Sequence, residues 1–496
     1  MAWNDNLDGS AIAIASSLAH RLRVMAGPGT GKSFAMKRRV ARLLEEAHVD
    51  PKRILAVTFT RVAADSLVSD LKELGIKNSD LIRAETLHSF CFSVLSQNEV
   101  LIRLGRKTRT LITYVDKKVL QFEAKPLLFD LSSNFGGQKE KSRKIGEFEA
   151  AWAKLQSDIP GWPVEPIDKQ FQREFLDWHL FHYSMTIGEV VPQTLQYFRI
   201  NPLVPELTMF DHVIVDEYQD LNRAEQELID LLSSNASLLI VGDEDQSIYK
   251  FRYAHPEGII EFSDRHEVED HALVECRRCS KLNVRLANYF IQQNHPDNKN
   301  RLIEKHSNPN GEICIVQWND RREQATHLAE YVSYLLQARN YEPGDILIIS
   351  PRRRLGYEIR DEIKKRNIAV HSFYDEEPLK SLRAQESYSL LSLFININDR
   401  VSLRFLLGSE SKDFFSNEYR TLRQYCVANQ VDPSTVLNQL VNGTLQLPNM
   451  NNICNRYLRI INHLQELRDK DLSSIVDTLF PQNEDQNYQR RQNTFV

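Results

Sequence analysis

Short apolar runs alternate with loops and helical stretches along the first half of the chain. The apolar runs stand at 22–25, 212–215 and 238–241, and each is followed by glycine or acidic residues. Runs of this length and setting are typical of strands buried in a parallel sheet. The first run leads through a glycine-rich bend into a helical stretch that ends near Leu44. The pattern therefore predicts an α/β fold built on a parallel sheet.

The pattern changes in three later parts of the chain. Residues 97–205 are helical in pattern and basic at their start. The segment 345–350, within "DILIISPRRR", is predicted to form a buried strand that leads into a basic turn. Residues 409–496 are helix-prone and polar. We find no internal repeat.

The composition is that of a globular protein with more than one domain. A chain of 496 residues exceeds one ordinary core, so about two to four domains are expected. No apolar run approaches the length of a bilayer span, and the first residues lack the layout of a signal peptide. The six cysteines form no disulfide framework, and Cys276 and Cys279 lack a second metal-binding pair. We therefore expect a cytoplasmic protein with no membrane partner.

The charge distribution leaves two interpretations open. The net charge of −5 argues against a chain that coats nucleic acid over its whole surface. Residues 101–144 nevertheless carry eleven Lys or Arg against four Asp or Glu. Such a run forms either a solvated basic face or a surface that contacts phosphates.

The glycine-rich bend has the pattern of a phosphate-binding loop. Its residues are Ala26, Gly27, Pro28, Gly29, Thr30, Gly31, Lys32 and Ser33. A strand–loop–helix of this kind turns successive backbone N–H groups toward phosphate oxygens at a helix N-terminus. Lys32 can bind the β- and γ-phosphates, and the Ser33 hydroxyl can coordinate Mg²⁺.

Two further strand ends carry the groups that hydrolysis of a nucleotide needs. The strand 212–215 is followed by Asp216, in a position to bind Mg²⁺, and by Glu217, in a position to act as the base for water. The strand 238–241 is followed by Gly242 and Asp243, and then by Gln246, which can sense the γ-phosphate.

Five ordered motifs resemble the UvrD/Rep-type superfamily 1 DNA helicases. They follow the phosphate loop "AGPGTGKS" in the chain and are "TFTRVAADSL", "TLHSFC", "DEYQDLN", "GDEDQSIYKFR" and the looser "LVECRRCSKLNVRLAN". The similarity covers roughly the first four hundred residues. It implies RecA-like P-loop lobes with parallel sheets and helical accessory domains. It also implies an ATP- and Mg²⁺-dependent 3′-to-5′ helicase that translocates on single-stranded or partly duplex DNA.

The resemblance assigns roles to individual residues. Lys32, Ser33, Asp216 and Glu217 would bind and hydrolyse ATP–Mg²⁺, with Gln246 on the γ-phosphate. Arg278 would approach the γ-phosphate from the second lobe. The residues implied in DNA binding are Thr58, Thr60, Arg61, His88, Tyr249 and Phe251. For the last two, packing in the core is the alternative, whereas stacking on bases would grip any sequence.

The resemblance also implies a domain layout. The first motor lobe would take residues 1–96 and 206–262, the accessory domain 97–205, a partial second lobe 263–408 and an insertion-like helical domain 409–496. In this setting the basic run 101–144 is expected to contact DNA. His179 and His182 share a helical face without further metal-binding companions, and we interpret them as structural.

The sequence departs from the family in two places. The glutamine that reads adenine before the phosphate loop is replaced by Ala11, and the late Lys-Gly-Leu-Glu and Thr-Arg-Ala motifs are absent. Three hypotheses fit the second departure: a shortened helicase, one half of an enzyme completed by a second polypeptide, or an ATP-gated DNA-binding module with little hydrolysis. No segment resembles a nuclease, so cleavage would require a partner.

Overall fold

The computed structural model of the protein separates into two units. Contacts group residues 1–311 with 389–468 in the first unit, and residues 312–388 with 469–496 in the second. The residues that the structure describes are 3–5, 7–105, 110–112, 122–294, 302–372 and 381–481. No helix in these ranges combines the length and the apolar character needed to cross a membrane.

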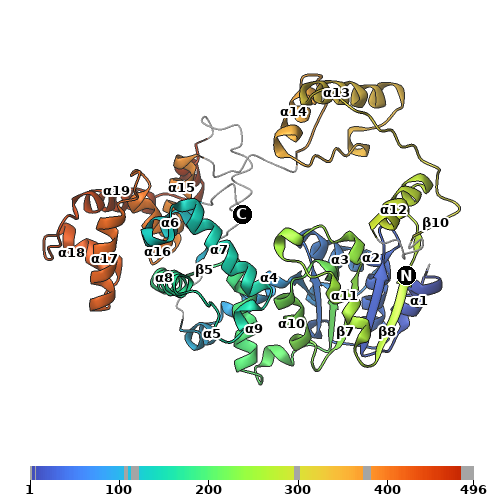
Figure 1. The fold of residues 1–496 in the computed structure, drawn as a ribbon, viewed down its shortest axis with the longest axis horizontal. Coiled ribbons are helices and arrows are strands. Elements are labelled where there is room, and N and C mark those ends of the chain that lie inside the picture. The colour runs from blue at the N-terminus through green and yellow to red at the C-terminus, as the bar shows by residue number, and fades with distance from the viewer. Residues whose placement is uncertain are drawn as a thin grey trace. The chain divides into compact units, whose positions relative to one another are not determined.

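A six-stranded sheet forms the centre of the first unit (Figure 1), and all of its strand pairs are parallel. Its strands are β1 (Arg21–Ala26), β2 (Ile54–Thr58), β3 (Arg83–Thr86), β6 (His212–Val215), β7 (Ser237–Gly242) and β8 (Val268–Leu273). Their order across the sheet is β3-β2-β6-β7-β1-β8. The predicted α/β fold on a parallel sheet is confirmed. The sheet extends past the predicted lobe limit at residue 262, because β8 pairs along the whole of β1.

Helices cover both faces of this sheet, which explains why its strands are continuous apolar runs. The helices α1 (Gly9–Ser16), α2 (Lys32–Glu45) and α3 (Arg61–Glu73) pack on one face. The helices α4 (Leu87–Leu95), α9 (Ile187–Ile200), α10 (Arg223–Leu232) and α11 (Glu257–Glu261) pack on the other. Neighbouring residues point to opposite faces: Leu239 of β7 lies in the first core and Ile240 in the second.

A mainly helical segment lies between β3 and β6 in the chain, where the sequence predicts the accessory domain. It contains α5 (Asn98–Arg103), α6 (Lys125–Asp130), α7 (Gln138–Ala153) and α8 (Pro166–His182), and the short strands β4 (Thr110–Ile112) and β5 (Ser184–Thr186) pair beside them. Phe148, Phe171 and Trp178 form its core. His179 and His182 are fully buried. The His182 Nε2 lies 2.8 Å from the Tyr419 hydroxyl, and the His179 Nδ1 lies 2.9 Å from the Ser184 hydroxyl, in line with the structural interpretation.

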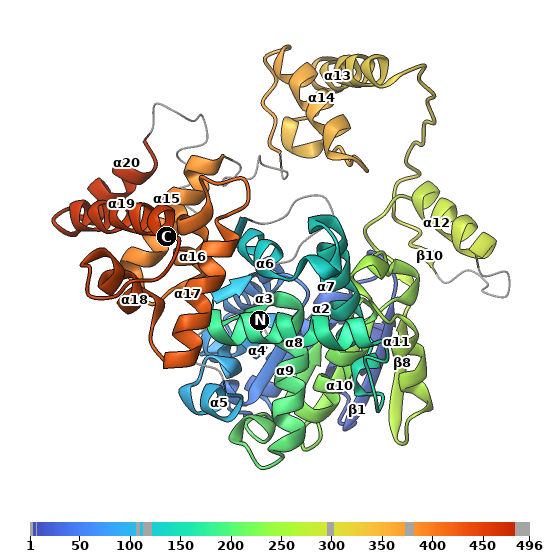
Figure 2. The same cartoon turned by 60° about the vertical axis from the view of Figure 1, so that its left-hand side comes forward.

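Four helices from the C-terminal part of the chain also belong to the first unit. They are α16 (Arg400–Gly408), α17 (Ser416–Asn429), α18 (Pro433–Val441) and α19 (Asn451–Arg468), preceded by α15 (Leu382–Ile395). Figure 2 shows these orange and red helices beside α6 of the accessory domain, where α16 packs. Residues 389–408 therefore group with the first unit, whereas the sequence analysis placed them in a second lobe. The functional roles of the domains stay predictions.

The second unit is built around two helices, α13 (Arg321–Ala338) and α14 (Arg353–Lys364). Ala325, Ala329 and Val332 of α13 pack against Ile359 and Ile363 of α14. This unit also contains α20 (Leu472–Leu479).

The strand predicted at 345–350 does not form. Ile346 and Ile348 pack against the helices, but Leu347 and Ile349 are 71% and 84% exposed. No strand is present among the described residues of this unit. A strand needs the backbone of a neighbour to complete its hydrogen bonds. Along this segment, packed and exposed side chains alternate as in a strand with one covered face. However, none of the described residues of this unit form a strand with which it could pair.

Candidate functional site

The loop between β1 and α2 has the backbone conformation of a phosphate cradle. Gly29 and Gly31 have φ values of 72° and 95°, which L side chains adopt only under strain. The Thr30 hydroxyl donates to the Gly27 carbonyl over 2.8 Å and closes the bend. Gly31 is the N-cap of α2, so the free N–H groups of the helix start face the loop. The predicted strand–loop–helix is present.

Residues 276–278 pack against the outer side of this loop. The Arg277 N–H donates to the Gly29 carbonyl over 2.8 Å, and the Cys276 thiol donates to the Pro28 carbonyl over 3.2 Å. A β carbon added at Gly29 would lie 2.9 Å from the Arg278 Cβ. The structure therefore brings Arg278 beside the phosphate loop, within the first unit rather than from a separate lobe. The short strand β9 (Glu275–Cys276), paired with β10 (Ile303–Glu304), and α12 (Lys281–Asn294) flank it.

The two predicted acids lie beside Lys32. The Lys32 Nζ is 2.5 Å from the Glu217 Oε1 and 3.9 Å from the Asp216 Oδ1. The acids come together there because β6 and β1 are parallel, so their carboxyl ends share one edge of the sheet. Glu217 has a left-handed φ of 54°, and its N–H donates to the Asp216 Oδ1 over 3.0 Å. Ser33 follows Lys32 in the first turn of α2.

Burial controls the protonation of Asp216. It raises the pKa of this carboxyl to about 6, and the charge of Glu217 acts in the same direction, while Lys32 opposes both. Burial also raises the pKa of Asp220 to about 6. A divalent cation binds the ionised carboxylate, so proton and cation compete at Asp216.

We expect Mg²⁺-dependent nucleotide binding to weaken as the pH falls through about 6. Below that pKa, the ionised fraction of Asp216 falls about tenfold per pH unit. The measurement is the Mg²⁺ concentration needed for half-maximal binding of a fluorescent ATP analogue between pH 5.5 and 8. The Asp216→Asn variant is the control, because it lacks the titration of Asp216 but keeps those of ATP and Asp220. Equal pH profiles for both proteins would contradict the assignment of Asp216 to the metal.

A hydrogen-bonded path leads from the acids to Gln246. The Gln219 Nε2 donates to the Glu217 Oε2 over 2.9 Å, and the Gln219 Oε1 accepts from the Asp243 N–H over 3.1 Å. The Gln246 Nε2 then donates to the Asp243 Oδ2 over 2.8 Å. The path is short because β7, which ends at Gly242, lies between β1 and β6 in the sheet.

Sequence reasoning missed the role of Gln219 and named Asp243 only as the end of a strand. The sequence did contain one signal, the glycine at position 242. In the structure, a β carbon added to Gly242 would lie 2.2 Å from the Gln219 Oε1. A glycine at the end of a buried strand often marks a close approach of another group.

An aromatic cluster follows Gln246. The Phe59 and Tyr249 ring centroids are 4.7 Å apart, and the Arg252 guanidinium lies 4.9 Å from the Phe59 centroid. Tyr249 also contacts Phe251, at 5.7 Å between centroids. Phe251 is 74% exposed, which excludes core packing for this residue. Sequence reasoning did not single out Phe59, although it stands between two threonines that were named.

The other predicted DNA-binding residues differ in accessibility. Thr58 is buried, and its hydroxyl donates to the Thr60 carbonyl over 2.9 Å. The Thr60 hydroxyl accepts from the Ala63 N–H and caps α3. His88 is half-buried, 3.5 Å from Glu225, and burial lowers its pKa. Arg61 is exposed. The hydroxyls of both threonines thus form hydrogen bonds within the protein, while Arg61 is exposed, and the DNA-binding roles of these residues stay predictions.

Comparison with known proteins decides the family. The model of the UvrD/REP helicase N-terminal domain matches residues 8–267, which is more than half of the chain. This chain belongs to the UvrD/Rep helicase family. It is 26% identical over 474 residues to the ATP-dependent DNA helicase PcrA of Staphylococcus epidermidis, and 25% identical over 497 residues to PcrA of Staphylococcus aureus. These alignments cover 92% and 95% of the chain, but only 63% and 65% of the two relatives.

Two lysines in the basic run of this UvrD/Rep family member form contacts within the protein. Lys141 is buried and donates to the carbonyls of Leu128 and Leu131 over 2.8 and 2.6 Å. Lys144 forms an ion pair with Asp168. These contacts point against the phosphate-binding role that we expected for these two lysines. Residues 106–109 and 113–121 of the run lie outside the described residues.

Proposed function

We propose that this chain is an ATP-driven 3′-to-5′ DNA helicase that moves along single-stranded DNA. The observation that carries the proposal is the path of hydrogen bonds from Glu217 through Gln219 and Asp243 to Gln246. It links the expected site of hydrolysis to the segment that bears Tyr249 and Phe251. The PcrA relatives are described as ATP-dependent DNA helicases, which supports the same function.

The donor set fits ATP with Mg²⁺. The backbone N–H groups of the loop and Lys32 suit the phosphates, and the Ser33 hydroxyl and Asp216 carboxylate are hard oxygen ligands that suit Mg²⁺. Bound there, the metal would offset the negative charge of the β- and γ-phosphates. Since the adenine-reading glutamine is replaced by Ala11, we propose no adenine selectivity from that position.

Lys32 and Glu217 would change partners when ATP binds. The ammonium group lies 2.5 Å from the Glu217 carboxylate, and a γ-phosphate would compete for it. Release from Lys32 frees Glu217 Oε1 to accept a proton from water, while Gln219 keeps hold of Oε2. The Cβ of Arg278 lies beside the loop, which supports the proposal that its guanidinium stabilises charge on the γ-phosphoryl group.

The strand-binding side would respond through Gln246. When Glu217 moves, Gln219 moves with it, and Gln219 also holds the Asp243 N–H. Asp243 in turn holds Gln246, three residues before Tyr249. The rings of Phe59, Tyr249 and Phe251 would stack on bases of any sequence.

The test uses the purified chain with ATP and oligo(dT). We expect oligo(dT) to raise the rate of ATP hydrolysis, and we expect ATP to drive displacement of streptavidin from a 5′-biotinylated strand but not from a 3′-biotinylated one. Displacement from the 3′ end alone would contradict the polarity. DNA binding that depends on ATP but without turnover would contradict the motor.

Several apolar side chains of the second unit are exposed. Ile315, Leu347 and Ile349 are 95%, 71% and 84% exposed, and exposed apolar groups of this kind mark contact surfaces. We propose that they are covered in the active helicase, by the same polypeptide or by a second one. A nuclease partner stays a prediction from the sequence.

A further inference from the structure

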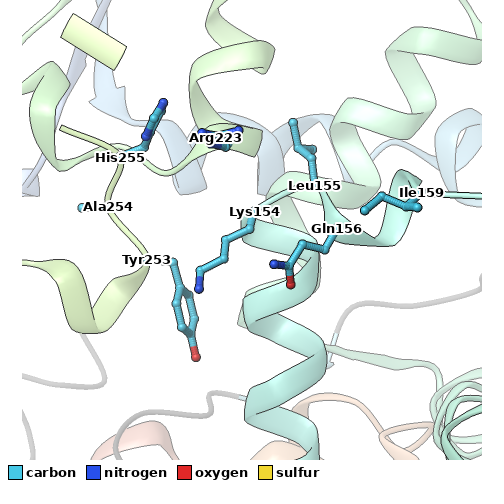
Figure 3. Close-up of a pocket in the computed structure, with 8 residues that line it drawn as sticks. All are labelled: Lys154, Leu155, Gln156, Ile159, Arg223, Tyr253, Ala254 and His255. Atoms are coloured by element: carbon cyan, nitrogen blue, oxygen red, sulfur yellow. The ribbon is translucent and has the colours of Figure 1, made fainter. Parts of the chain in front are cut away.

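A cleft of about 520 Å³ lies between the accessory domain and the loop that follows the aromatic cluster. Figure 3 shows the side chains around it, from the end of α7, the start of α10 and residues 253–255. The lining residues are Lys154, Leu155, Gln156, Ile159, Arg223, Tyr253, Ala254 and His255.

The cleft combines cations with an aromatic ring. The Lys154 Nζ lies 5.5 Å from the centroid of the Tyr253 ring, and Figure 3 shows the lysine side chain extending toward that ring. The Tyr253 hydroxyl donates to the Gly146 carbonyl over 3.1 Å, which holds the ring in place. Arg223 is the first residue of α10, directly after the N-cap residue Asn222.

Two of these cations are available for a ligand. Among the described residues, neither Lys154 nor Arg223 forms an ion pair with a carboxylate, and both are exposed. His255 differs, because its ring nitrogens lie 3.1 and 3.5 Å from Glu257 and Glu261. The cleft therefore presents two cations beside an aromatic face, a combination that suits a phosphodiester and its base.

The cleft adjoins the proposed strand-binding surface on two sides. Tyr253 directly follows Arg252, whose guanidinium lies over the Phe59 ring. Arg223 is two residues before Glu225, which lies 3.5 Å from His88. A strand that stacks on Tyr249 and Phe251 can therefore continue toward Tyr253.

We propose that the cleft binds one nucleotide of the DNA strand, with the base on the Tyr253 ring and the phosphate between Lys154 and Arg223. This inference rests on the proposed function and extends it to the accessory domain. The contact of Lys154 with the Tyr253 ring does not prevent a base from stacking there. A cation–π contact at an exposed site is weaker than the stacking of a base on an aromatic ring.

The phosphate contacts are tested by the salt dependence of binding. For single strands, each phosphate contact contributes about 0.7 to the slope of log K against log salt concentration. The double variant Lys154→Gln, Arg223→Gln is expected to lower the slope for oligo(dT) by about 0.7, measured by fluorescence anisotropy, because the two cations share one phosphate. Lys169→Gln removes one positive charge at an exposed lysine of α8 outside the cleft, and is expected to leave the slope unchanged.

The stacking contact is tested by a matched pair of substitutions. Tyr253→Leu is expected to weaken oligo(dT) binding about 5- to 150-fold, which corresponds to the loss of one stacked base. Tyr253→Phe keeps the ring and is expected to bind like the natural protein. Both variants lose the hydroxyl that donates to Gly146, so the comparison isolates the ring.

The outcomes separate this inference from the proposed function. An unchanged salt slope in the double variant would overturn the cleft inference, while DNA-stimulated hydrolysis in the natural protein would leave the proposed function standing. Unchanged oligo(dT) binding in Tyr253→Leu would overturn the stacking contact. Absence of oligo(dT) binding in the natural protein would overturn both.

Discussion

Replacing Glu217 by glutamine is expected to abolish DNA-stimulated ATP hydrolysis while ATP binding persists. The amide removes the group that accepts a proton from water, and such groups contribute about 10²–10⁴-fold to rate. It also removes the charge that competes for Lys32, 2.5 Å away, so ATP affinity should hold or rise. The measurements are phosphate release with oligo(dT) and equilibrium binding of a fluorescent ATP analogue. Lys32→Ala is expected to lose both ATP binding and ATP hydrolysis.

Gln219→Leu is the companion variant, because it leaves Lys32, Asp216 and Glu217 in place. It removes the two hydrogen bonds that join Glu217 to the Asp243 N–H. We expect DNA-independent hydrolysis to continue and its stimulation by oligo(dT) to be lost. Full stimulation in this variant would show that the signal takes another route. Full ATP turnover in both Glu217→Gln and Lys32→Ala would contradict the assignment of these residues to the hydrolytic site.

Replacing Arg404 by methionine is expected to destabilise the first unit by about 3–5 kcal/mol. The Arg404 side chain is fully buried and donates to the Asp130 carboxylate over 2.6 and 2.9 Å, and Trp178 donates to the same carboxylate over 3.0 Å. Methionine fills similar space but leaves the Asp130 charge buried without a cation. Hydrogen exchange of α6 and α16, with denaturant unfolding, measures the effect.

Two controls separate the buried charge from other causes. Adding Asp130→Leu to Arg404→Met is expected to recover most of the stability, since the uncompensated charge is removed. Arg459→Met breaks an exposed ion pair with Glu410 in the same unit and is expected to cost less than about 1 kcal/mol. If the Arg404 variant were no less stable than the Arg459 variant, α16 would not depend on this pair.

The Arg404–Asp130 pair also bears on domain organisation. It joins two segments separated by 274 positions in the chain, one from the accessory domain and one from the C-terminal helices. Tyr419 of α17 adds to the junction through its contact with His182. No periodicity in either segment indicates this contact, so the sequence placed α16 in a different domain.

The local chemistry of the nucleotide site could be predicted because each part is encoded in a few adjacent residues. A glycine-rich bend between an apolar run and Lys32 is sufficient to predict a strand, a loop and a helix start. An apolar run that ends in Asp216 and Glu217 similarly predicts acids at a sheet edge. The structure has all of these elements at the expected residues.

Only the tertiary structure decided which segments far apart in the chain come into contact. The order of strands puts β7 between β1 and β6, and this alone lets Gln219 join Glu217 to Asp243. Lys141 has the charge of a DNA ligand, but burial under α6 turns it toward carbonyl groups. The strand expected at 345–350 has the right pattern, but no strand among the described residues of its unit can complete its hydrogen bonds. The pattern of apolar and polar side chains determines which face of a segment is buried. Which other segments pack against that face depends on the fold of the whole chain.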